Sequence, residues 1–118
     1  MDRMTDAELR AIHRIFGVNP KVETDVCRLR NFWYYFANDF KFRIGDTKIT
    51  CRIIRERFVD VPSTEYHITG FVEYRQNGTS GYMINFKAEL KSPDDDMTIE
   101  RTIRKAIDKS FGKFKKIY

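Results

Sequence analysis

The sequence predicts an α+β fold for this 118-residue chain, a four-stranded antiparallel meander covered on one face by helices. Two patterns predict it. Apolar and polar residues alternate with period 2 in four segments between residues 40 and 90, which is typical of strands that bury one face. Apolar residues recur at helical spacing on both sides of that region. Because a sheet with one apolar face needs cover, the expected element order is α-α-β-β-β-β-α.

Length and composition suit one domain over residues 1–118. Charged residues make up 33% and aromatic residues 14%, and a chain of this length buries about two-thirds of its unfolded surface. No apolar run approaches the roughly 20 residues that span a bilayer, so no transmembrane segment is expected. The first residues carry no secretion signal, and the two cysteines have no metal-like spacing. We therefore expect an intracellular protein, cytoplasmic or nuclear.

The first predicted element is a helix that begins at a capping box. In Thr5-Asp6-Ala7-Glu8, the side chains of Thr5 and Glu8 would satisfy free amides at the helix start. Gly17 is a plausible stop, and the apolar residues between the two ends have helical spacing: Leu9, Ile12, Ile15 and Phe16.

A second helix is predicted from Asn19-Pro20, an N-cap followed by proline, to about residue 38. Apolar residues recur here at intervals of 4, 3, 4, 3 and 4, at Val22, Val26, Leu29, Trp33, Phe36 and Phe40. A coiled coil has the same spacing, but the short, partly aromatic seam favours a core helix. One helix face cannot bury all four aromatics of residues 33–36, so Tyr34 or Tyr35 is expected to be exposed.

Residues 40–53 are predicted to form a hairpin with two different faces. Gly45-Asp46 fits a two-residue turn that sets Phe42 opposite Ile49 and Phe40 opposite Cys51. The same register sets Arg43 opposite Lys48, a like-charge pair that should cost stability unless an anion lies over it. The alternation slips at Ile53-Ile54, and a β-bulge at this point would restore the apolar face.

A second hairpin and a closing helix complete the predicted fold. The apolar faces of the strands at residues 66–74 and 82–90 agree if a three-residue loop with left-handed Gly78 joins them. Ser92-Pro93-Asp94-Asp95-Asp96 is a strong helix start. The order of helix, four strands and helix is similar to that of kinase-associated lipid-binding domains and, more loosely, of cystatin-like folds. That similarity is architectural, and it implies no site because no motif residues of either family are present.

The outer face of the predicted sheet carries cations and one apolar ring. These are Lys41, Arg43, Lys48, Arg52, Arg55, Arg57 and Phe71. Cations that follow phosphates, with an exposed ring that stacks a base, are typical of surfaces that bind single-stranded nucleic acid. We therefore expect a protein that binds RNA or single-stranded DNA on this face. A solvated face with a basic edge strand has the same composition and remains an alternative.

Two other surfaces remain open as alternatives. The closing helix carries a basic side, with Arg101, Arg104, Lys105, Lys109, Lys113, Lys115 and Lys116. Exposed tyrosine is common at protein interfaces, so Tyr34 and Tyr35 on the second helix could dock an acidic partner protein or a second copy of the chain.

Catalysis and metal binding have little support in the sequence. Cys51 is expected in the core and His67 on the outer face, so the two cannot form a nucleophile–base pair. The acidic run Asp94–Asp96 suits helix capping better than cation binding. We therefore expect a protein that is not an enzyme and that has no catalytic residue, no metal and no cofactor.

Overall fold

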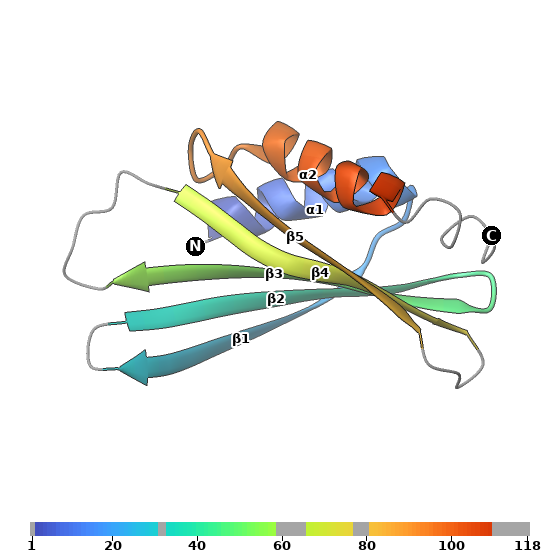
Figure 1. Ribbon diagram of the computed structural model, residues 1–118, viewed down its shortest axis with the longest axis horizontal. Coiled ribbons are helices and arrows are strands. Elements are labelled where there is room, and N and C mark those ends of the chain that lie inside the picture. Colours follow the sequence, from blue (N-terminus) through green and yellow to red (C-terminus); the bar gives the residue numbers. More distant parts are fainter. Residues whose placement is uncertain (1, 31–32, 59–65, 77–80, 110–118) are drawn as a thin grey trace.

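The computed structural model describes residues 2–30, 33–58, 66–76 and 81–109, and its fold is α+β with five strands between two helices (Figure 1). The elements are α1 (Asp2–Phe16), β1 (Lys21–Arg30), β2 (Trp33–Ile44), β3 (Thr47–Phe58), β4 (Tyr66–Gln76), β5 (Tyr82–Leu90) and α2 (Asp96–Lys109). The strands form one antiparallel sheet in the order β1-β2-β3-β4-β5. Both helices lie on the same side of this sheet and pack against each other.

The predicted second helix is wrong, because residues 21–30 and 33–44 are the paired strands β1 and β2. In this hairpin Val22 lies opposite Phe40, and Val26 lies opposite Phe36. The residues between them on the same face are polar: Thr24 lies opposite Asn38. These two polar residues break the period-2 alternation that marks a strand, so the remaining apolar positions had helical spacing by coincidence.

The first predicted hairpin is confirmed. Phe42 pairs with Ile49, Phe40 with Cys51, and Arg43 with Lys48. Gly45 has φ +59°, as the two-residue turn requires. The predicted bulge is wrong, however, because the register of β2 and β3 continues without a shift to the pair of Trp33 and Phe58.

The second predicted hairpin is also confirmed. Tyr74 pairs with Tyr82, which is the register that a three-residue connection produces, although the loop itself lies outside the described residues. Gly70 lies where β3 and β4 approach closely. A Cβ atom on Gly70 would lie 1.9 Å from the backbone oxygen of Arg52, so a side chain cannot be accommodated without a shift of the backbone.

The helix ends differ in part from the prediction. Gly17 ends α1 as predicted, with φ +68° and an amide that donates to the His13 carbonyl at 2.7 Å. Because α1 begins at Asp2, Thr5 and Glu8 lie inside the helix and do not form a capping box. At the start of α2, Asp95 is the cap, and its carboxylate accepts from the Thr98 amide at 3.1 Å.

The core lies between the helices and the inner face of the sheet. Its helical part is Ala7, Ala11, Ile12, Ile99, Ile103 and Ala106. Its sheet part includes Cys51, Ile68, Val72, Ile84 and Phe86, and Phe42 is half-buried against the core. No helix in the described part of the chain is both long enough and apolar enough to cross a membrane.

Candidate functional site

On the outer face of the sheet, two of the predicted cations are already paired with acids. Lys41 Nζ lies 2.7 Å from Glu23 Oε2, and Arg52 donates two hydrogen bonds to Asp39, at 2.6 and 2.8 Å. Both acids belong to the β1–β2 hairpin, most of which is predicted as a helix from the sequence. The outer face near β1 is therefore a mixed surface of ion pairs rather than a basic one.

Phe71 lies on the outer face as predicted, beside Arg52. The two residues pair across β3 and β4, and the Arg52 guanidinium carbon lies 5.5 Å from the Phe71 ring centroid, within cation–π distance. Two hydrogen bonds to Asp39 hold Arg52 beside the half-buried Phe71 ring.

Three cations lie directly opposite one another at the other end of the outer face. Arg43 pairs with Lys48, and Lys48 pairs with Arg75. All three are exposed, and Arg75 contacts Glu73 at 3.2 Å. Arg43 and Lys48 have no ion-pair partner among the residues that the structure describes. This group, the cation row, confirms the predicted like-charge pair and adds a third member.

The remaining predicted site residues lie elsewhere. Arg55 is buried on the inner face, 6% exposed, because β3 continues without a bulge. Tyr34 and Tyr35 lie on β2 rather than on a helix, and Tyr35 is half-buried. The side chains of Arg57 and Tyr34 lie outside the described residues.

A buried polar cluster on the inner face explains the position of Arg55. Glu8 of α1 is fully buried, and its carboxylate accepts from Asn38 Nδ2 at 2.8 Å and lies 3.5 Å from Arg55 Nε. Thr24 donates to Asn38 Oδ1 at 2.8 Å. Burial raises the pKa of Glu8 to about 7, although Arg55 and the Asn38 hydrogen bond oppose the rise. This cluster is not predicted from the sequence. A signal was present in the sequence, because Glu8 lies one helical turn before Ile12 and therefore on the apolar face of the predicted helix.

A groove of about 820 Å³ runs along β5 and is lined on its other side by α2. We refer to it as the β5–α2 groove. The sheet contributes Thr69, Phe71, Asn85 and Lys87, and the helix contributes Thr98, Arg101, Thr102, Lys105 and Lys109. The four cations of the groove are exposed, and no acidic residue is among its described lining residues. The groove therefore joins part of the predicted outer-face site to the predicted basic side of the closing helix.

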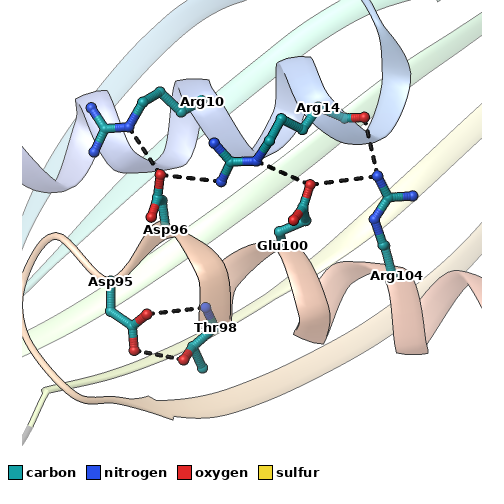
Figure 2. A network of polar contacts seen from close by, with 7 residues as sticks. All are labelled: Arg10, Arg14, Asp95, Asp96, Thr98, Glu100 and Arg104. Atoms are coloured by element: carbon teal, nitrogen blue, oxygen red, sulfur yellow. Dashed lines mark hydrogen bonds and ion pairs between the residues drawn. The ribbon is translucent and has the colours of Figure 1, made fainter.

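Two acids of α2, Asp96 and Glu100, lie on the opposite flank of the helix, against α1. Figure 2 shows that Asp96 contacts Arg10 and Arg14, at 3.0 and 3.1 Å. Glu100 contacts Arg14 at 3.1 Å and Arg104 at 3.4 Å. Of the predicted basic side of the helix, Arg104 is thus part of this network, whereas Arg101, Lys105 and Lys109 line the groove.

The described residues contain no group of three or more His, Cys, Asp or Glu side chains placed to hold a metal ion. Cys51 is fully buried, and burial raises the pKa of its thiol far above the ordinary value. Comparison of the chain with models of known families, with curated proteins and with solved structures finds no match in any of the three.

Proposed function

We propose that this protein binds single-stranded nucleic acid, RNA or single-stranded DNA, along the β5–α2 groove. The observation that carries the proposal is the separation of charge on α2. Asp96 and Glu100 face α1 and are paired with arginines there, while Arg101, Lys105 and Lys109 line the groove together with Lys87 of β5. A concave surface with one sign of charge attracts an anionic polymer.

The spacing of the helical cations suits a chain of phosphates. Arg101, Lys105 and Lys109 recur every fourth residue on one face of α2, so successive cations lie about 6 Å apart along the helix. This distance is comparable with that between adjacent phosphates of an extended single strand. A single compact anion would contact one or two of these cations, whereas a polymer can contact all of them.

The sheet side of the groove offers contacts for bases. The Phe71 ring lines the groove and is held against Arg52, and aromatic rings stack bases of any sequence. Asn85, directly opposite Phe71 on β5, presents an amide that both donates and accepts hydrogen bonds. The cation row lies farther along the same outer face and would extend the path of a longer strand.

The proposal is tested by the salt dependence of binding to a fluorescein-labelled oligouridine, measured by fluorescence anisotropy. In the double variant Arg101→Gln/Lys105→Gln, the slope of log affinity against log salt should fall by about 1.4, or about 0.7 for each lost phosphate contact. Phe71→Ala should instead weaken binding by about 1–3 kcal/mol with little change in slope, because stacking releases no counterions.

A matched control is Lys21→Gln/Lys91→Gln, which removes two exposed positive charges outside the lining of the groove. Its salt slope should equal that of the parent protein. If both double variants lower the slope equally, binding follows net charge and the groove is not the site. The variant Arg43→Gln/Lys48→Gln tests whether the bound strand also reaches the cation row. Its salt slope should be lower than that of the parent protein only if Arg43 and Lys48 contact phosphates.

A further inference from the structure

We infer that the β5–α2 groove prefers RNA to DNA, because Thr98 and Thr102 present hydroxyl oxygens that accept a hydrogen bond from a ribose 2′-OH. This inference rests on the proposed function and names the class of strand that the groove selects.

The hydrogen bonds of the two threonines determine what they can offer a ligand. A hydroxyl has one proton to donate and two lone pairs that accept. Thr102 donates its proton to the Thr98 carbonyl at 2.7 Å, and Thr98 donates its proton to Asp95 Oδ2 at 2.5 Å. Both protons are therefore used within the helix, so toward the groove each hydroxyl acts only as an acceptor.

Asp95 keeps Thr98 in this role. Partial burial raises the pKa of the Asp95 carboxyl, but hydrogen bonds from Thr98 and from the Lys91 amide outweigh it and leave the pKa below its ordinary value. Asp95 is thus ionised at neutral pH and can only accept. The Thr98 hydroxyl must then be the donor in this pair.

A hydroxyl that can only accept a hydrogen bond contacts favourably only those groups of a nucleic-acid strand that have a proton to donate. Phosphate oxygens and the ring oxygen of the sugar have no proton to donate, so they gain nothing from Thr98 or Thr102. The ribose 2′-OH is the backbone group that donates, and it is the group that lets proteins tell RNA from DNA.

The positions of the threonines on α2 fit this contact. Thr98 and Thr102 are separated by one helical turn, as are Arg101 and Lys105, and both pairs line the groove. The two pairs form parallel rows, because residues four apart share a helix face. A strand laid along α2 with its phosphates on the cations would therefore place successive sugars beside the threonines.

The experiment compares three oligouridines of equal length that differ only at the 2′ position: ribose, deoxyribose and 2′-fluoro. The fluoro sugar resembles ribose in shape but has no proton to donate. With the parent protein, the ribose oligomer should bind tighter than the deoxyribose oligomer by roughly two- to tenfold per hydrogen bond formed. The 2′-fluoro oligomer should bind like the deoxyribose oligomer.

The variant Thr102→Val removes one acceptor at nearly constant shape. Its ribose-to-deoxyribose affinity ratio should fall, because only the ribose oligomer loses a hydrogen bond. In the matched control Thr50→Val, at a half-buried threonine outside the groove lining, the ratio should not change. Circular dichroism checks that each variant folds.

Equal binding of the ribose and deoxyribose oligomers overturns the inference and leaves the proposed function standing. Binding of the 2′-fluoro oligomer as tight as that of the ribose oligomer also overturns it, because sugar shape would then explain the preference. If none of the oligomers binds, the proposed function fails and this inference fails with it.

Discussion

At the scale of the single residue, Glu8 is an ionisable group held inside the interface between a helix and the sheet. Its carboxyl is fully buried, and burial raises its pKa from 4.5 to about 7 against the opposing effects of Arg55 and Asn38. The folded protein therefore holds this proton over a pH range in which the unfolded chain has released it. Stability in that range must depend on pH.

We predict that the free energy of unfolding falls as the pH rises between about pH 5 and about pH 8. The folded state binds more protons than the unfolded state in this window, so raising the pH favours unfolding. A shift from 4.5 to about 7 corresponds to a loss of about 3 kcal/mol. Urea unfolding at a series of pH values measures this loss.

Glu8→Gln is the control for this prediction, because glutamine keeps the shape and does not titrate. The pH dependence should nearly disappear in this variant, whatever its absolute stability. Asp95 and Asp96 do not interfere, since both have pKa values below the ordinary value and titrate at lower pH. An equal slope in the parent and in Glu8→Gln would show that another group is responsible.

At the scale of the elements, the sequence correctly predicts the strands whose inner faces are uniformly apolar and fails where they are not. Apolar and polar residues alternate regularly in β4 and β5, so both strands and their register could be predicted from the sequence. In β1 and β2 the inner face contains Thr24 and Asn38, and in β3 it contains Arg55.

One buried polar cluster therefore caused three errors. Thr24 and Asn38 interrupt the apolar alternation of β1 and β2, so this hairpin was not predicted. Arg55 led to the prediction of a bulge in β3, and Glu8, which accepts a hydrogen bond from Asn38, led to the prediction of a capping box. Each of these residues is polar at a position where pattern analysis expects an apolar one. Their partners are distant in sequence, so no local pattern could reveal that they contact one another.

The same limit applies to the candidate site. Lys87, Arg101, Lys105 and Phe71 were each recognisable in the sequence as outward-facing, but their meeting in one groove depends on how α2 lies along β5. The acids that neutralise Lys41 and Arg52 could not be anticipated for a related reason. They lie on the hairpin that was predicted as a helix.

The cation row makes a prediction at the scale of the hairpins. Lys48 has a cation opposite it on each neighbouring strand, Arg43 on β2 and Arg75 on β4. Lys48→Glu replaces two like-charge pairs by two opposite-charge pairs, so the free energy of unfolding at low salt should rise by roughly 0.5–1 kcal/mol. Chemical denaturation measures the change.

Salt should reduce this gain, because the three side chains are exposed. Lys87→Glu is the matched control, since Lys87 is also exposed and lies opposite the uncharged Thr69. A loss of stability in Lys48→Glu at low salt would mean that the cross-strand charges do not interact as their register implies.

At the scale of the whole molecule, charge differs between the two edges of the sheet. The β1 edge carries Glu23 and Asp25, with Asp39 beside them on β2. The β5 edge and the adjoining flank of α2 carry the cations of the groove. An anionic strand should therefore approach from the β5 side, because the acids near the β1 edge offset the positive charge of Lys21, Lys41 and Arg52.

Hydrogen–deuterium exchange tests this expectation. On addition of an oligouridine, amide exchange should slow in residues 85–88 of β5 and residues 98–109 of α2, which line the groove. Exchange in β1, residues 21–30, should not change. Protection confined to β1 and β2 would place the bound strand on the opposite edge and contradict the proposed site.

The ion pairs of Figure 2 also fix the direction of the two helices. Arg10 and Arg14 meet Asp96 and Glu100 in the same order along the chain, so α1 and α2 run parallel, with the end of α1 beside the start of α2.

The carboxyl end of a helix carries partial negative charge and the amino end partial positive charge. Arg14 thus lies in the last turn of α1, where the dipole favours cations, and Asp96 lies in the first turn of α2, where the dipole favours anions. Arg104 also donates to the Arg14 carbonyl at the end of α1, at 3.1 Å. Exchanging the signs of Arg14 and Asp96 would keep their mutual attraction but oppose both dipoles, so the helix dipoles favour the cation on α1 and the anion on α2.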